Sequence, residues 1–198
     1  FKEVKRVLKK EGTLWLNLGD SYNSSPHWDS KDYGIGKTIH KGRTGTKELK
    51  PKDLVGIPWR VAFALQADGW YLRQDIIWHK PNPMPESVTD RCTKSHEYIF
   101  LLTKSPKYYF DNEAIKEPMR ADALARMKRG SNHNGDRGFP DGPQNHIKNY
   151  FNKDEKEAEE EFNAGRNKRS VWTITTKPYS EAHFATFPYD LIAPMIKA

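Results

Sequence analysis

The residues best suited to bind a polar ligand lie in a short proline-rich stretch. Lys80-Pro81-Asn82-Pro83-Met84-Pro85 alternates three prolines with a cation and an amide, and only His79 separates it from an apolar run that ends at Trp78. Because proline fixes its backbone angle φ, such a loop keeps its shape before a ligand arrives. Lys80 could contact a phosphate, and Asn82 could hydrogen-bond a base edge. A rigid exit from a strand, carrying a solvated lysine, is an equally good interpretation.

A second candidate combines one histidine with aromatic and small residues in Glu181-Ala182-His183-Phe184-Ala185-Thr186-Phe187-Pro188. It lies between a predicted strand and a predicted helix, which is where open α/β sheets bind ligands. A buried aromatic cluster with a hydrogen-bonded histidine explains the same residues, and composition alone favours that interpretation. Asp20 follows another predicted strand and is interpreted as the cap of a turn rather than as a catalytic acid.

Spacing excludes several other kinds of chemistry. Gly34-Ile35-Gly36-Lys37-Thr38 ends like a phosphate-binding loop, but Lys31 stands where that loop needs a glycine, and no strand directly precedes it. Cys92 is the single cysteine and the seven histidines form no HxxxH pair, so we expect no disulfide and no metal site. These residues also give no basis for nucleophilic catalysis.

The composition favours a polyanionic partner. The 33 Lys and Arg exceed the 26 Asp and Glu, so the net charge is +7, which suits nucleic acid although many basic proteins bind none. Hydrophobic residues make up 36% and aromatic residues 12%, which predicts a small aromatic core with long polar loops. The sequence has no apolar run of membrane-helix length and no signal peptide at its start, so we expect a cytoplasmic protein without membrane association.

The elements that must position these residues alternate between helices and strands, which predicts an α/β fold. An amphipathic helix over 1–8 leads through Gly12 to an apolar strand over 13–18, which we expect to be buried on both faces of a parallel sheet. A helix from Pro58 to 68–69 is expected to turn Val61, Ala64 and Leu65 inward. Further strands are predicted over 71–78, 97–103 and 170–174, and a helix over 190–198.

Three regions follow from this pattern. Residues 1–111 are expected to form the core, with a long loop at 23–52. Residues 112–169 are polar and form a variable region, partly disordered, that is expected to recognise a target. Residues 170–198 supply a final strand and helix that lead into the ligand site.

Several segments, taken in order, resemble the DNA amino-methyltransferases, the N4-cytosine/N6-adenine family, in its permuted beta-type arrangement with the catalytic half first. The resemblance covers most of the chain except 23–50 and 112–169. It implies a Rossmann-like, S-adenosylmethionine-dependent methyltransferase sheet with an antiparallel strand. The matching segments are 1–22 (the helix and strand after the catalytic loop), 52–60 with 73–87 (a strand and the KPNPMPES loop), 96–102 (the antiparallel strand), and 169–172 with 183–188 (the approach to the cofactor site).

Two motifs of that family do not occur in the sequence. There is no Asp/Asn/Ser-Pro-Pro-Tyr tetrapeptide, whose polar side chain and carbonyl accept hydrogen bonds from the target amino group, and no glycine-rich cofactor loop. Ser25-Pro26-His27-Trp28 lacks the second proline and follows the wrong strand. We therefore expect a sheet that is incomplete at both ends, no catalytic residue among these 198, and no activity from this chain alone.

The resemblance implies an enzyme that moves a methyl group from S-adenosylmethionine to the exocyclic amino group of cytosine (N4) or adenine (N6) at specific DNA sites. Such an enzyme would serve restriction-modification or phage self-protection, would flip its target base out of the duplex, and could be a homodimer. The target-base or DNA loop would be Lys80, Pro81, Asn82 and Pro83. The cofactor would contact His183, Phe184, Ala185, Thr186, Phe187 and Pro188. The DNA backbone would meet Lys37, Lys41, Arg43, Arg120, Arg126, Lys128, Arg129 and Arg137.

Two other functions fit the same residues. One is a non-catalytic DNA-binding module that keeps this scaffold, and the other is a methyltransferase that acts on RNA or protein. The sequence does not separate cytosine from adenine as the target.

Overall fold

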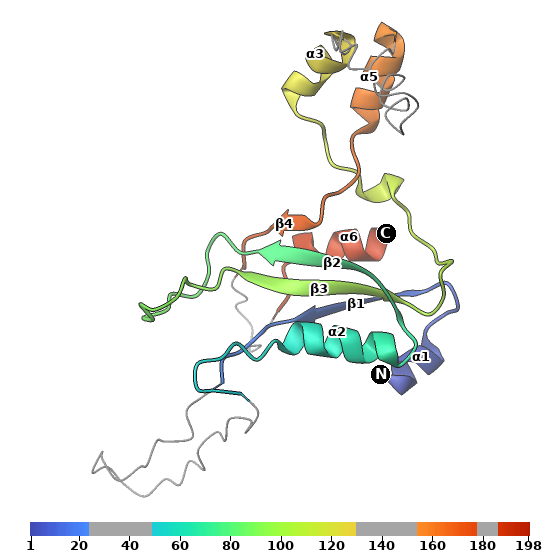
Figure 1. Cartoon of the computed structure of the whole chain (residues 1–198). Helices are drawn as coiled ribbons and strands as arrows, with labels where there is room; N and C mark the ends of the chain where they lie inside the picture. The colour runs from blue at the N-terminus through green and yellow to red at the C-terminus, as the bar shows by residue number, and fades with distance from the viewer. Residues whose placement is uncertain (24–48, 130–153, 178–185) are drawn as a thin grey trace, which may run out of the picture. The chain divides into compact units, whose positions relative to one another are not determined.

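The computed structural model describes residues 1–23, 49–129, 154–177 and 186–198 (Figure 1). The chain divides into two compact units, each described by itself below. The first comprises residues 1–109 and 170–195, and the second comprises residues 110–169 and 196–198. The first unit holds the sheet, so it contains the strands whose exits carry the candidate ligand residues.

The first unit is built on a mixed sheet with the strand order β1-β3-β2-β4. These strands are β1 (Thr13–Leu18), β2 (Tyr71–His79), β3 (His96–Thr103) and β4 (Val171–Thr173). β3 runs antiparallel to both β1 and β2, and β4 runs parallel to β2. β1, β2 and β4 therefore point the same way and end at one edge of the sheet (Figure 1). The predictions of an α/β fold and of an antiparallel strand at 96–102 are confirmed.

The predicted environment of β1 is wrong in two respects. β1 pairs with β3 in antiparallel register, from Thr13 opposite Thr103 to Leu18 opposite Tyr98, and all six of its residues are only half-buried. Among the described strands, β3 is instead the one with β1 on one side and β2 on the other, and its residues 99–103 are buried. An apolar run predicts burial, but it does not say which distant strand provides the hydrogen bonds.

One face of the sheet is covered by α2 (Ile57–Ala67). Its buried positions are Pro58, Ala62 and Leu65, which recur at the spacing of one helix face. Ala62 and Leu65 pack with residues of β3 such as Phe100 in one apolar cluster. Leu65 is thus buried as predicted, whereas Ala64 is exposed, because the inward face is centred on Ala62. Val61 is partly buried against the same cluster, so the helix and two of its three predicted inward positions are confirmed.

A short helix completes that side of the first unit. α1 (Lys2–Val7) precedes β1, and Leu8 packs against the cluster formed with α2. The Lys5 ammonium donates hydrogen bonds to the carbonyls of Asp68 (3.2 Å) and Gly69 (3.0 Å), directly after the last residue of α2. A cation at this position stabilises the carbonyl groups that a helix leaves unpaired at its end.

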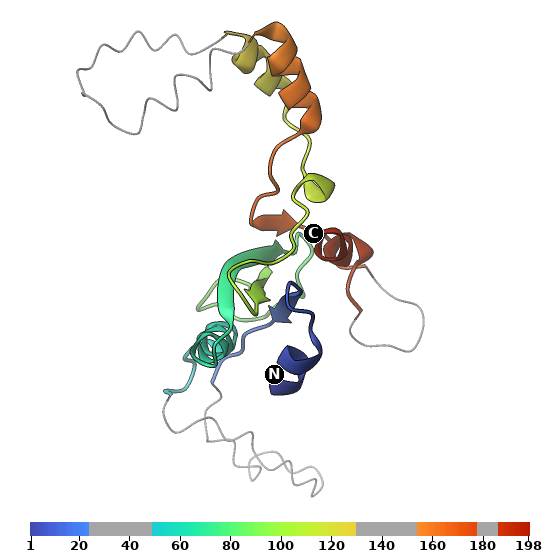
Figure 2. The same ribbon diagram turned by 90° about the vertical axis from the view of Figure 1, so that its right-hand side faces the viewer.

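The opposite face of the sheet packs against α6 (Tyr189–Lys197), so helices lie on both sides (Figure 2). Leu191 of α6 is fully buried with Ile76, Trp78 and Ile99 of the sheet, and Trp172 of β4 joins them. The alternating exposure of β4 and the helix near the end of the chain agree with the predictions. None of the helices in the described ranges is long and apolar enough to cross a bilayer.

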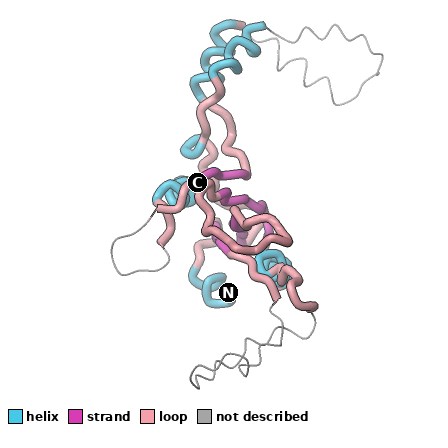
Figure 3. The backbone as a smooth tube through the Cα atoms, turned by 90° about the vertical axis from the view of Figure 1, so that its left-hand side faces the viewer, coloured by secondary structure: helices cyan, strands magenta, loops and turns pink. Residues whose placement is uncertain are grey.

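The second unit contains η1 (Glu113–Ile115), α3 (Ala121–Arg129) and α5 (Glu155–Ala164). α3 and α5 lie side by side (Figure 3), and the Lys128 ammonium of α3 pairs with Glu159 of α5. At the base of this pair of helices, Glu117 and Arg166 exchange two backbone hydrogen bonds of 2.8 Å. Within the described part, its buried apolar residues are Ile115, Ala158 and Ala198, so this unit has a small core.

Candidate functional site

The candidate site is the edge at which β1, β2 and β4 end. In open α/β sheets, ligands bind outside the carboxyl ends of the parallel strands. The segments that leave the sheet at this edge are 19–23 after β1, 80–95 after β2 and 174–177 after β4. Two of the candidates from the sequence, Lys80 and Asn82, lie in the segment after β2.

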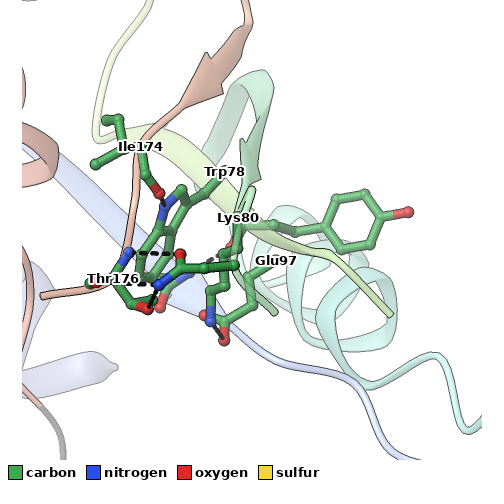
Figure 4. A network of polar contacts seen from close by, with 8 residues as sticks. Trp78, Lys80, Glu97, Ile174 and Thr176 are labelled. Carbon is green, nitrogen blue, oxygen red and sulfur yellow. Dashed lines mark hydrogen bonds and ion pairs between the residues drawn. The ribbon is translucent and has the colours of Figure 1, made fainter. Parts of the chain in front are cut away.

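Lys80 is held over a buried indole at the exit of β2. Its Nζ lies 4.2 Å from the ring centroid of Trp78, and it forms an ion pair with the carboxylate of Glu97 on β3 (Figure 4). The Lys80 and Glu97 side chains are 19% and 25% exposed, so water reaches both only in part. A Cβ atom on Gly19 would lie 4.0 Å from the Glu97 carboxylate, which places the pair beside the exit of β1. A phosphate that binds Lys80 must therefore compete with Glu97.

Asn82 uses its side-chain amide to hold the segment after β4. Its Oδ1 accepts a hydrogen bond from the Thr176 N–H (3.1 Å). Its Nδ2 donates to the Thr176 Oγ1 (2.9 Å) and to the Thr176 carbonyl (3.3 Å). Pro81 and Pro83 flank it, and proline restricts the backbone on both sides. The rigidity predicted for this loop therefore presents Asn82 to another part of the chain.

Two further hydrogen bonds join the end of β2 to the segment after β4. The Ile174 N–H donates to the carbonyl of His79 (3.0 Å), and the Trp78 indole N–H donates to the carbonyl of Ile174 (2.8 Å) (Figure 4). Trp78 thus packs under Lys80 with its ring and fixes Ile174 with its nitrogen. The exits of β2 and β4 are joined from His79 to Asn82.

The rest of the loop between β2 and β3 is tied to the exit of β1. The Arg91 guanidinium lies 4.0 Å from the Tyr22 ring centroid and forms a 2.5 Å ion pair with Glu86. This hydrogen bond from Arg91 is the main reason why the pKa of Glu86 lies below its ordinary value. Lys52 binds Asp90 at 2.8 Å and lowers the pKa of that carboxyl in the same way.

Asp20 has the structural role predicted for it. Its Oδ1 accepts hydrogen bonds from the N–H of Ser21 (2.9 Å) and from the N–H of Ile57 (3.0 Å). Ile57 is the first residue of α2, so Asp20 satisfies a backbone donor that a helix start leaves unpaired. A carboxylate at this end of a helix is also favoured by the helix dipole.

The predicted cofactor segment is described only at its end. Thr186 and Phe187 are exposed, and Pro188 is buried, with its carbonyl accepting the N–H of Leu191 (3.0 Å) at the start of α6. The remaining cofactor candidates and the excluded phosphate-loop pattern, 34–38, lie outside the described residues. The former are His183, Phe184 and Ala185.

Three of the predicted DNA-backbone cations are described with their side chains, and each has an acidic partner. The guanidinium groups of Arg120 and Arg126 lie 3.2 Å and 3.7 Å from the Asp122 carboxylate. Lys128 pairs with Glu159 and, at 4.0 Å, with Glu155. The other predicted cations, Lys37, Lys41, Arg43, Arg137 and the side chain of Arg129, lie outside the described residues.

Sequence reasoning missed a basic cluster in the second unit. The Glu117 carboxylate lies 3.5 Å, 3.4 Å and 3.3 Å from the cationic groups of Arg166, Lys168 and Arg169. Burial acts to raise the pKa of Glu117, but Lys168 and Arg169 outweigh burial and lower it. The basic run at 166–169 is visible in the sequence, whereas its acidic partner stands far away along the chain. Within the described ranges, no group of three or more His, Cys, Asp or Glu could hold a metal ion.

Comparison with known proteins assigns the family. A family model described as DNA methylase matches residues 1–198. The Type II methyltransferase M.Cfr9I of Citrobacter freundii is 45% identical over 203 residues, which cover 100% of this chain and 53% of that protein. The Type II methyltransferase M.SmaI of Serratia marcescens is 46% identical over 190 residues, which cover 95% of this chain and 52% of that protein.

A third relative agrees with these two. The Type II methyltransferase M.XycI of Xanthomonas campestris pv. cyanopsidis is 44% identical over 203 residues, covering 100% of this chain and 53% of that protein. The chain thus spans about half the length of the curated relatives it matches. The sheet order and these matches agree with the resemblance seen in the sequence, and the chain belongs to the DNA methylase family, the N6/N4 amino-methyltransferases.

Proposed function

We propose that the protein containing this chain transfers a methyl group from S-adenosylmethionine to the exocyclic amino group of cytosine or adenine in DNA. The observation that carries the proposal is the antiparallel β3 between the parallel strands β1 and β2, in a chain of the DNA methylase family. This strand order supports a Rossmann-like methyltransferase sheet. Its relatives are named Type II methyltransferases, which supports a role in restriction-modification.

The edge formed by the strand exits suits a flipped base and a cofactor. A base inside a duplex hides its amino group, so it must leave the stack before it can react. Lys80 over Trp78 would approach the DNA strand at this edge, with Glu97 holding the ammonium in place until a phosphate arrives. Residues 112–169, with Arg120, Arg126 and Lys128, are proposed as the target-recognition region because they carry cations outside the sheet.

The described end of the cofactor segment fits a partly apolar ligand. Phe187 and Tyr189 are 54% and 75% exposed at the start of α6, and exposed aromatic rings of this kind gain contact area when a ligand covers them. Phe187, with Thr186 beside it, would pack on the cofactor, and Pro188 would fix the start of the helix. S-adenosylmethionine, when bound, supplies the electrophilic methyl group.

The proposal is tested with the protein encoded by the full reading frame. We expect label from S-adenosyl-[methyl-³H]methionine to enter duplex DNA and, after digestion to nucleosides, to appear in N4-methylcytosine or N6-methyladenine. Binding of DNA without any transfer would favour the non-catalytic module, and label in RNA or protein but not in DNA would favour the third function. Because the 198 residues contain no Pro-Pro-Tyr sequence, we expect no transfer by them alone.

A further inference from the structure

We propose that Asn82 is a positioning residue for the cofactor side of the site, rather than a contact to the DNA base. The inference rests on the proposed function, since it concerns the site in which S-adenosylmethionine would bind. Three hydrogen bonds join Asn82 to Thr176, and they connect the loop after β2 with the segment after β4. The two sides of the site are therefore coupled through contacts within the chain itself.

Asn82 continues the β2–β4 pairing where the backbone of β2 cannot. The parallel pairing is formed by bonds such as Ile77 N–H to the carbonyl of Ser170 (2.8 Å) and Ile174 N–H to the carbonyl of His79 (3.0 Å). Beyond His79, the N–H of Lys80 donates to Ser95 on the other side. Pro81, which follows, has no N–H at all. The Asn82 side chain carries the same donor and acceptor as a peptide group, and it supplies both to Thr176.

The amide that we expected to read a base edge has little capacity left for that role. An asparagine side chain offers two N–H donors and one carbonyl oxygen. Nδ2 donates to two oxygens of Thr176, and Oδ1 already accepts the Thr176 N–H. Oδ1 keeps its second lone pair, but a base that accepts an N–H from Asn82 could bind only after the Nδ2 bonds to Thr176 break. Loss of those bonds would release the segment that they hold.

The segment held by Asn82 leads to the proposed cofactor residues. Lys177 follows Thr176, and its ammonium pairs at 2.8 Å with Asp190 in the first turn of α6. Phe187 and Pro188 stand immediately before that turn. Asn82 thus anchors the chain before residues 178–185 at Thr176, and the ion pair between Lys177 and Asp190 joins that segment to the first turn of α6, which follows them. Loss of the Asn82 bonds should loosen the cofactor side even though Asn82 lies in the loop after β2.

The experiment measures S-adenosylmethionine affinity without DNA, by equilibrium dialysis with the full-length protein. Asn82→Ala removes three hydrogen bonds at an exposed site, so we expect roughly five- to thirtyfold weaker cofactor binding. Met84→Ala is the matched control, because Met84 is 84% exposed on the same loop, and it should bind like wild type. If Asn82 instead contacts DNA alone, Asn82→Ala lowers DNA affinity and leaves DNA-free cofactor affinity unchanged, which overturns the inference.

Two graded variants keep the test informative. Asn82→Asp retains the acceptor for the Thr176 N–H and loses both donors, so its cofactor affinity should fall between those of wild type and Asn82→Ala. Thr176→Val removes only the hydroxyl acceptor and should cost roughly threefold or less. If Asn82→Ala fails to fold by circular dichroism, wild-type affinity in Asn82→Asp overturns the inference. If the wild-type protein itself binds no S-adenosylmethionine, the proposed function fails instead.

Discussion

Replacing Glu97 by glutamine should destabilise the first unit by more than the loss of a surface ion pair does. Exposed pairs are worth about 0.2–1 kcal/mol, whereas removing one partner of a buried pair costs about 3–5 kcal/mol. The Lys80 and Glu97 side chains are 19% and 25% exposed, so the ammonium reaches some water once its partner is lost. We therefore expect the free energy of unfolding to fall by about 1.5–2.5 kcal/mol in Glu97→Gln.

A double-mutant cycle isolates the interaction between the two charges. Lys80→Met is the second single variant, because methionine keeps an unbranched chain against the Trp78 ring. Unfolding by urea of wild type, both single variants and the double variant should give a coupling energy of about 1–1.5 kcal/mol. The control is Glu3→Gln, whose partner Arg6 is 70% exposed, and it should change stability by no more than about 0.5 kcal/mol.

The outcome also bears on the role of the pair. A coupling energy near zero, with both single variants as stable as wild type, would refute the reasoning that burial strengthens this contact. Neutral behaviour of the Glu97→Gln variant alone would mean that the Trp78 ring is sufficient to hold the ammonium. If the coupling energy is as expected, Glu97 holds the Lys80 ammonium in place. A DNA phosphate must then displace the Glu97 carboxylate before it can pair with that ammonium.

Three further predictions concern the surroundings of the site and the second unit. Asp20→Ala should lower the free energy of unfolding by about 1 kcal/mol through loss of the α2 cap, while Asp20→Asn keeps the acceptor and most of the stability. Gly165→Ala should speed hydrogen exchange in α5, because Gly165 has a φ of +82° and a Cβ there would lie 2.7 Å from the Glu117 carbonyl oxygen. The folded-state pKa of Glu86 is lowered, chiefly by Arg91, so its contribution is present above the ordinary value of 4.5 and is lost as the pH falls through the lowered value. Proteolysis of the loop at 86–94 should therefore accelerate below about pH 4.5, and Arg91→Gln should remove most of that pH dependence.

Local patterns predicted the helices and strands of the first unit, whereas the helices α3 and α5 of the second unit were not predicted. The pairing of the strands could not be predicted from local patterns. Turn and helix signals around Pro58 and Gly69 define α2, and apolar runs define the strands, because these signals act over a few neighbouring residues. The position of β1 depends on its pairing with β3, which lies far along the chain. No residue between 13 and 18 records that partner, so periodicity alone suggested a parallel sheet.

The same contrast holds at the site. Proline spacing identified the loop that carries Lys80 and Asn82, and turn chemistry correctly assigned Asp20. The partners lie far along the chain, Glu97 on β3 and Thr176 in the segment after β4, so the local sequence around Lys80 and Asn82 did not predict them. An amide in a rigid loop suits a base and a peptide group equally well, and only the parallel pairing of β4 with β2 shows which of the two lies beside it.

The central place of β3 governs when the sheet can assemble. β2 and β3 are joined by residues 80–95 and can pair as soon as residue 103 has emerged from the ribosome, because closing a short loop costs little entropy. β1 emerges from the ribosome much earlier. Its apolar side chains and its backbone hydrogen-bonding groups remain exposed until β3 has emerged and pairs with it. β4 joins only after residues 110–169 of the second unit have been made. Non-local pairing of this kind slows folding and leaves strand edges open to association. We therefore expect the yield of native protein to depend on chaperones and on the rate of translation through β2 and β3.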